Sequence, residues 1–135
     1  MPTYHLDTST LSYAFRNEGR VAQTLRRLPR TDIGISSPVL YEARAGMLRL
    51  PNGARKQSLL TALDRLCASV EVVPFDARAA EAAAGIRTAL EQSGSLIGPI
   101  DIQIASVALS RGAVLVTHNT REFERVAGLL LQDWY

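Results

Sequence analysis

Apolar residues occur along this chain in two alternating patterns, short continuous runs and stripes at helical spacing. Short runs predict five buried strands, over residues 4–6, 33–35, 70–73, 113–116 and 129–131. Apolar positions three and four residues apart predict helices around residues 9–15, 21–28, 38–47, 59–67, 79–90 and 100–109. A further short helix is expected after the polar turn at residues 117–120. The pattern therefore predicts strands that alternate with helices.

Proline and glycine mark where these elements begin and end. Pro29 and Pro74 follow a helix and a strand, and the run 51–53 (Pro-Asn-Gly) separates two helices. Pro38 suits the first turn of a helix, where no backbone N–H is needed. Gly112 turns the chain from the helix at 100–109 into the next strand. These signals give the predicted elements their boundaries.

Alternation of this kind predicts an α/β fold. We expect residues 1–135 to form one domain of three layers, α/β/α, with helices on both faces of a mostly parallel, twisted sheet. A chain of 135 residues that is 47% hydrophobic can build one such core but not two. Ligands of open parallel sheets collect at the carboxyl ends of the strands, so functional residues are expected there.

Composition narrows the setting of the protein without naming a function. No apolar run approaches the roughly 20 residues that cross a bilayer, and the N-terminal residues lack the pattern of a signal peptide. Cys67 is the only cysteine, which favours a reducing, cytoplasmic location. The net charge is +2, and the basic residues are arginines except for Lys56. No membrane partner is expected.

Four carboxylates lie where apolar elements meet polar turns. Asp7 ends the first strand, Glu42 lies early in the helix after the second, Asp101 opens the helix before the fourth, and Glu122 follows the fourth strand. Parallel topology would bring these residues to one edge of the sheet. Clustered carboxylate oxygens suit Mg²⁺ or Mn²⁺, and such ions can promote phosphodiester hydrolysis.

Each acid also has an ordinary structural interpretation. Asp7 and Asp101 could cap helices or complement the helix dipole, and Glu42 could pair with Arg44 or Arg49. Glu122 could be an acid in the first turn of a short helix. Asn119 is interpreted as the N-cap of that helix, with the binding of a water or a carboxylate as its alternative role.

Six motifs, in this order and spacing, resemble one family over nearly the whole chain. They read LDTST, SSPVLYEARAG, VEVVPFD, AAAGIRTALEQSGSLIGPIDIQIAS, LVTHNTREFERVAGL and the final DW. The sequence resembles the PIN-domain ribonucleases, and among them the VapC-type toxins of type II toxin–antitoxin pairs. It is most similar to the branch described as initiator-tRNA-cleaving endonucleases.

The resemblance implies a site and a reaction. It implies cleavage of single-stranded RNA that depends on Mg²⁺ or Mn²⁺ and leaves a 5′-phosphate and a 3′-hydroxyl. Asp7 and Asp101 match the main metal-binding residues, Glu42 the acid carried on a helix, and Glu122 falls in the motif of the fourth acid. Its supporting residues would be Thr8 and Ser9, which hydrogen-bond Asp7, and Thr117 and Asn119, which shape the opposite wall.

Two positions beside this site depart from the family. Ser9 and His118 both stand where asparagine is common among relatives. Neither change removes an acid, so the resemblance still implies an active enzyme. His118 adds a titratable ring next to the site.

Arginines and leucines suggest the partners. RNA would be contacted by arginines such as Arg16, Arg20, Arg44 and Arg121, with further candidates at positions 26, 27, 49 and 125. Leu48, Leu50, Leu59, Leu60 and Leu63 exceed what so small a core needs, so part of this set would contact a second copy of the chain or an antitoxin. The resemblance implies a homodimer and a VapB-like antitoxin.

Other classes of function fit the sequence less well. A receiver domain would need a lysine after the last strand, and a haloacid-type phosphatase would need Asp-x-Asp where Ser9 stands. A catalytically inactive PIN-like protein that binds RNA or regulates is the alternative that stays open.

Overall fold

The computed structural model describes residues 2–135 and contains a five-stranded sheet. The strands are β1 (Tyr4–Leu6), β2 (Ile33–Ser36), β3 (Glu71–Val73), β4 (Val114–Val116) and β5 (Leu130–Gln132). They pair in the order β3-β2-β1-β4-β5, and every pairing is parallel. The predicted α/β fold with a parallel sheet is confirmed, and each strand lies within one or two residues of its predicted range.

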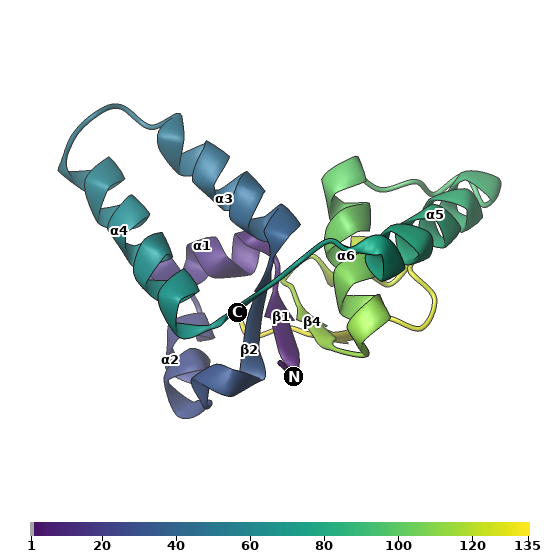
Figure 1. Cartoon of the computed structure of the whole chain (residues 1–135), viewed down its shortest axis with the longest axis horizontal. Coiled ribbons are helices and arrows are strands. Elements are labelled where there is room, and N and C mark those ends of the chain that lie inside the picture. Colours follow the sequence, from purple (N-terminus) through teal and green to yellow (C-terminus); the bar gives the residue numbers. More distant parts are fainter. Residues whose placement is uncertain (1) are drawn as a thin grey trace.

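Helices cover both faces of this sheet. They are α1 (Thr8–Arg16), α2 (Val21–Arg27), α3 (Ser37–Leu48), α4 (Ala54–Ser69), α5 (Ala77–Gln92), α6 (Pro99–Arg111) and the short α7 (Thr120–Phe123), with a 3-10 turn, η1 (Arg30–Asp32). Helices α1 to α4 gather on one side of the strands, and α5 and α6 lie on the other (Figure 1). Within the part of the chain that is described, no helix is long and apolar enough to span a membrane.

The core lies between the central strands and the helices beside them. Leu6, Ile33, Ile35 and Leu115 are fully buried in the sheet. Helix α6 is buried on most of its circumference, which explains why its apolar residues show no clear helical stripe. The small side chains of the alanine-rich α5 let it pack closely against α6. This packing fixes the start of α6 relative to the strand ends.

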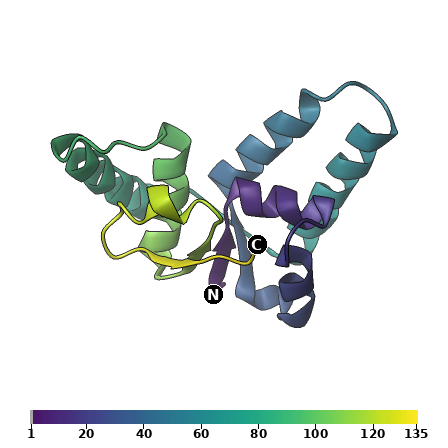
Figure 2. The ribbon, with the colours of Figure 1, turned by 180° about the vertical axis from the view of Figure 1, so that it is seen from behind.

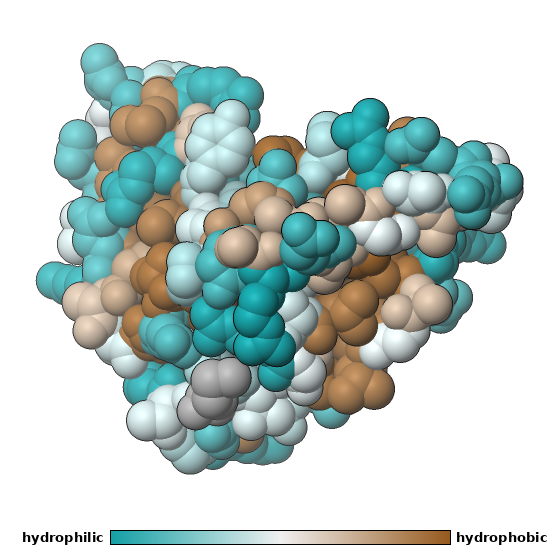
Figure 3. Space-filling model, turned by 45° about the vertical axis from the view of Figure 1, so that its right-hand side comes forward, coloured by the Kyte–Doolittle hydropathy of each residue, from teal (hydrophilic) through white to brown (hydrophobic). Residues whose placement is uncertain are grey.

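Two arms rise on either side of the strand ends. Helices α3 and α4 form one arm as an antiparallel pair joined by the Pro-Asn-Gly turn at residues 51–53, and α5 and α6 form the other. The space-filling view shows a notch between these arms (Figure 3). From behind, the C-terminal segment after β5 returns toward α1 (Figure 2). The strand ends, the starts of α1 and α6, and one side of α3 therefore surround the notch.

Candidate active site

Asp7 stands at the end of β1 and is held from two sides. Its Oδ1 accepts a hydrogen bond from the backbone N–H of Thr10 at 2.8 Å, which makes Asp7 the N-cap of α1. Its Oδ2 accepts a hydrogen bond from the Thr117 hydroxyl at 2.6 Å. The side chain is 5% exposed, and burial raises the pKa of Asp7 although these hydrogen bonds oppose the effect. Asp7 therefore caps α1 with one oxygen and is held by Thr117 through the other, so the capping interpretation does not exclude a functional role.

Asp101 lies in the first turn of α6, beside a glycine. A Cβ atom added to Gly98 would come within 3.3 Å of the Asp101 Oδ2, so the glycine leaves space next to this carboxylate. Burial, followed by repulsion from Glu122, Glu42 and Asp7, raises the pKa of Asp101 to about 6. Three acids that are 21 to 94 residues away in sequence therefore act on one carboxylate.

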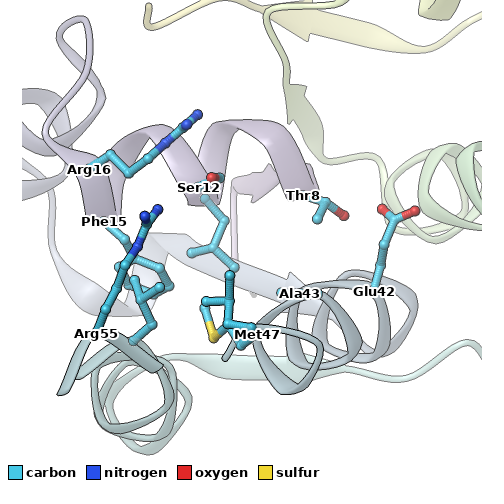
Figure 4. Close-up of a pocket in the computed structure, with 12 residues that line it drawn as sticks. Thr8, Ser12, Phe15, Arg16, Glu42, Ala43, Met47 and Arg55 are labelled. Atoms are coloured by element: carbon cyan, nitrogen blue, oxygen red, sulfur yellow. The ribbon is translucent and has the colours of Figure 1, made fainter. Parts of the chain in front are cut away.

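Glu42 faces the site from α3. Its negative charge contributes to the raised pKa of both Asp7 and Asp101. The alternative pairing with Arg44 is not formed, because Arg44 binds Asp64 of α4 at 2.6 Å. In the close-up, the carboxylate of Glu42 and the hydroxyl of Thr8 point into the space between α1 and α3 (Figure 4).

Glu122 is positioned by Asn119. The Asn119 side-chain amide donates a hydrogen bond to Glu122 Oε2 at 2.5 Å, and the Asn119 backbone N–H donates to the Thr117 hydroxyl oxygen at 2.9 Å. Asn119 occupies the N-cap position of α7, but its side chain does not cap the helix. The role of holding a carboxylate, which the sequence left as the alternative, is the one that the structure shows.

These four acids share an electrostatic environment without forming a closed ligand cage. Among residues 2–135, no three carboxylate, imidazole or thiol groups lie close enough to hold one ion directly. Mg²⁺ commonly binds one or two carboxylates and keeps several waters, so a cation does not require such a cage here. The all-oxygen donors, their mutual repulsion and the space beside Gly98 fit a hard divalent cation.

A groove of ≈ 240 Å³ extends from this site along α1, with α3 and α4 as its other wall. Apolar side chains such as Leu11, Phe15 and Met47 form its floor, and Glu42 lies at one end. Arg16 and Arg55 lie at the other end, with their guanidinium groups directed outward (Figure 4). The groove therefore runs from negative to positive charge.

Two of the expected supporting contacts are wrong. Ser9 is exposed, and the Thr8 hydroxyl is buried without a hydrogen-bond partner within the described part of the chain. The groups that hold Asp7 are instead the Thr10 N–H and the Thr117 hydroxyl. The reason is geometric: the first turn of α1 directs its free backbone N–H, rather than these side chains, at the N-cap carboxylate.

The predicted arginines fall into different surroundings. Arg16 lines the groove, whereas Arg20 and Arg121 are exposed on neighbouring segments. Arg44 lies on the side of α3 opposite the groove, where it is paired with Asp64, so it does not line the groove. Arg55 was missed by the sequence reasoning, although its place just after the turn at residues 51–53 puts it at the start of α4, facing α1.

The leucines that were expected to contact a partner also differ in their surroundings. Leu63 is fully buried and cannot contact a partner, whereas Leu48 is 55% exposed. Leu59 and Leu60 pack partly against the core. Leu48 and the exposed Tyr41 lie together on the side of α3 that faces away from the groove. We call this apolar surface, formed by Leu40, Tyr41, Ala45 and Leu48, the outer face of α3.

Comparison with known proteins agrees with the fold. The sequence model of the PIN domain family matches residues 4–129, which is nearly the whole chain. The chain therefore belongs to the PIN-domain family, and within it its sequence groups with the ribonucleases named VapC.

Two curated relatives show how far this similarity extends. The tRNA(fMet)-specific endonuclease VapC of Shigella flexneri is 35% identical over 138 residues, which is 99% of each chain. Ribonuclease VapC2 of Rickettsia felis is 35% identical over 133 residues, which is 97% of each chain.

Solved structures of VapBC complexes contain chains with a similar fold. In the complex VapBC2 from Rickettsia felis, bound to a DNA fragment from its promoter, the similar chain is 34% identical with a TM-score of 0.86 over 98% of both chains. In DNA-bound VapBC from Salmonella typhimurium, the similar chain is 30% identical with a TM-score of 0.88 over 100% of both chains.

Proposed function

We propose that this protein is an endoribonuclease that hydrolyses phosphodiester bonds in single-stranded regions of RNA and acts as the toxin of a VapBC-type pair. The observation that carries the proposal is the arrangement at the carboxyl ends of the strands: Asp7 ends β1 and is held by Thr117 after β4, and the charges of Asp7, Glu42 and Glu122 all act on Asp101 at the start of α6. The names of the relatives support the same activity.

A Mg²⁺ or Mn²⁺ ion would be held by Asp7 and Asp101, with Glu42 and Glu122 binding directly or through waters. When bound, such a cation stabilises negative charge on phosphodiester oxygens and makes a water more acidic. The hydrogen bond from Thr117 keeps one oxygen of Asp7 directed, and Asn119 does the same for Glu122. These contacts hold the two carboxylates in place before any substrate arrives.

The groove along α1 supplies a path for the RNA. Arg16 and Arg55 at its far end can bind backbone phosphates, and the apolar floor excludes water from part of the path. Arg121 on α7 would contact the strand on the opposite side of Asp101.

The substrate we propose is a structured RNA with an exposed single-stranded segment, such as initiator tRNA. The Shigella flexneri relative carries this specificity in its name and is 35% identical over nearly its full length. Proteins that recognise RNA sequence mostly bind unpaired segments, and such a segment can follow the groove between α1 and α3.

A VapB-like antitoxin and a second copy of the chain are the protein partners of this proposal. Structures of similar chains are of VapBC complexes. The outer face of α3 leaves Tyr41 65% and Leu48 55% exposed, which is costly for a surface that stays in water. We propose that this face is covered in the assembled protein, in the reducing cytoplasm that a single cysteine favours.

Expression in bacteria of the wild type, Asp7→Asn, Asp101→Asn and the control Glu81→Gln tests the proposal. Glu81 is an exposed acid on α5 that is not among the acids acting on Asp101. We expect growth arrest and new RNA 5′ ends with the wild type and the control, and neither with the two Asn variants. Equal growth of all four strains would instead favour the inactive RNA-binding alternative.

The metal is tested separately on purified protein. Millimolar Mn²⁺ should raise the melting temperature of the wild type and of Glu81→Gln, because the cation relieves repulsion among the acids. Asp7→Asn and Asp101→Asn should show a smaller rise. Equal rises in all four proteins would overturn the assignment of the metal to these residues.

A further inference from the structure

Three aromatic rings from three separate segments of the chain contact one another. The rings of His118 and Tyr135 are stacked, with centroids 4.3 Å apart and planes at 21°. Tyr13 of α1 meets both rings edge-on, with centroids 4.8 Å from Tyr135 and 5.9 Å from His118. We call this cluster of Tyr13, His118 and Tyr135 the aromatic platform.

Polar contacts hold the platform in position. Asp133 accepts a hydrogen bond from the Tyr135 backbone N–H at 2.9 Å, and its other oxygen lies 2.9 Å from His118 Nδ1, which donates to it. Burial opposes ionisation of Asp133, but these hydrogen bonds outweigh it and keep its pKa below the usual value. Gly19 adds a close contact, since a Cβ atom there would come within 2.8 Å of the Tyr135 carbonyl carbon. The rings are therefore fixed before anything binds.

The platform keeps a substantial free surface. Tyr135 is 42% exposed, and the His118 side chain is 45% exposed. An anchor for the C-terminal segment alone would bury its rings, as Trp134 does at 9% exposure against Tyr4. Stacked rings that stay exposed are suited to receive another flat ring.

The platform is connected to the acids through neighbouring residues of the chain, and it contacts Arg16. His118 directly follows Thr117, whose hydroxyl binds Asp7. Tyr13 lies six residues after Asp7, or about 9 Å along the axis of α1 at 1.5 Å per residue. Arg16 connects the platform with the groove, because its guanidinium carbon lies 5.6 Å from the centre of the Tyr13 ring while its side chain also lines the groove.

We propose that the aromatic platform is a nucleobase subsite, on which one unpaired base of the RNA substrate stacks next to the bond that is cut. The inference rests on the proposed ribonuclease function and adds to it the residues that position the strand. Stacking on aromatic side chains together with nearby positive charge is how proteins hold single-stranded nucleic acid. Arg16, which also pairs with Glu18 at 3.4 Å, supplies positive charge at Tyr13, and Arg20 acts electrostatically on Asp133, the acid that is hydrogen-bonded to His118.

Binding of a fluorescent single-stranded RNA of twelve nucleotides, measured by anisotropy, tests the subsite. The Asp101→Asn variant serves as the background, so that the RNA stays intact. In this background, His118→Ala and Tyr135→Ala should each weaken binding by roughly 5- to 100-fold, the range expected for one lost base stack. His118→Phe, which keeps a ring but loses the bond to Asp133, should bind within a few-fold of the background.

Two controls separate stacking from other effects. Leu130→Ala removes an exposed apolar side chain from β5 at the opposite end of the sheet and should leave binding unchanged. An abasic strand of the same length should bind all of these proteins equally, because it offers phosphates but no rings. Unaltered melting temperatures of His118→Ala and His118→Phe show that the comparison is made on folded protein.

The outcomes distinguish this inference from the function on which it rests. If the protein with native Asp101 cleaves RNA, but His118→Ala and Tyr135→Ala bind the strand as tightly as the background, the platform is only structural. If His118→Ala and Tyr135→Ala weaken binding of the normal strand and of the abasic strand equally, the rings do not act by stacking on a base. If the protein with native Asp101 neither binds nor cleaves RNA, the proposed function itself fails, and the subsite fails with it.

Discussion

The Thr117 hydroxyl donates a hydrogen bond to Asp7 at 2.6 Å, although 110 residues separate the two in sequence. Both side chains are buried, and they stand at the ends of β1 and β4, which are neighbours in the sheet. The Thr117 oxygen in turn accepts from the Asn119 N–H, and Asn119 holds Glu122. One short network therefore connects two of the four acids.

Replacing Thr117 with valine keeps the shape of the side chain and removes this hydrogen bond. Because the bond lowers the pKa of Asp7, its loss should move the acidic limb of the pH–activity profile to higher pH. We also expect a loss of about 1–2 kcal/mol in the free energy of unfolding at pH 7. Thr117→Ser retains the hydroxyl and should resemble the wild type in both measurements; a profile in Thr117→Val that does not move would contradict the role of the bond.

Asp101→Asn should stabilise the protein when no divalent cation is present. The pKa of Asp101 is raised from 3.8 to about 6, so its ionisation destabilises the native state as the pH rises through this window. Asn cannot ionise, and we expect a gain of about 1 kcal/mol at pH 7, reduced by solvent because the residue is half-buried. Denaturant unfolding with EDTA measures the gain, which should vanish below pH 4. Glu81→Gln should show no gain, and a less stable Asp101→Asn protein at pH 7 would refute the repulsion among the acids.

His5 should make the protein less stable in mild acid. This ring in β1 is 2% exposed, and burial, with a smaller effect of the charge on Arg111, lowers its pKa from 6.5 to about 4. Below pH 6.5 the unfolded chain binds a proton that the native chain does not, so stability falls as the pH drops toward 4, by up to about 3 kcal/mol.

The variant His5→Leu tests this dependence. Both ring nitrogens of His5 lack a hydrogen-bond partner within the described residues, so leucine should cost little at pH 7. The free energy of unfolding of the variant should exceed that of the wild type by an amount that grows between pH 6.5 and 4. A constant difference across this range would show that His5 does not carry the effect.

Gly19→Ala should destabilise the protein and disturb the aromatic platform. Gly19 has φ +61°, where an alanine is strained by about 1 kcal/mol, and the added Cβ would approach Tyr135 closely. Gly85→Ala is the control and should change stability in the opposite direction, because Gly85 lies inside α5 and no atom lies within 4 Å of the added Cβ. There we expect a gain of about 0.5–1 kcal/mol. Thermal unfolding of both variants checks the pair, and similar changes in the two would contradict this account of Gly19.

The alternation of apolar runs and helical stripes was sufficient to predict the elements and the parallel sheet. The predicted ends of elements were least accurate where no proline or glycine marks the end. Val70, for example, was predicted to begin the third strand, but it is the residue that follows α4, and β3 begins at Glu71. Helix α6 was predicted to span residues 100–109 and extends over Pro99–Arg111, because Gly112 in the left-handed conformation is its true end. Local signals of this type act over a few residues, so they are visible in sequence.

Contacts across the fold could not be predicted in the same way. Nothing near Asp7 in sequence indicates that Thr117 rather than Thr8 or Ser9 supplies its hydroxyl donor. From the sequence alone, Arg44 and Arg55 are equally plausible as residues that contact RNA. In the structure, Arg44 on α3 points toward Asp64, whereas Arg55 at the start of α4 lines the groove. Side-chain direction depends on how helices pack, which is a tertiary property.

The sequence by itself determined which residue types stand at the ends of the strands, because apolar runs, breakers and acids are arranged along the chain. Only the tertiary structure decided that the charges of Glu122, Glu42 and Asp7 all act on Asp101, and that Tyr13, His118 and Tyr135 contact one another. Electrostatic repulsion and ring stacking act through space over a few ångströms, and only the packing of strands and helices brings distant segments that close.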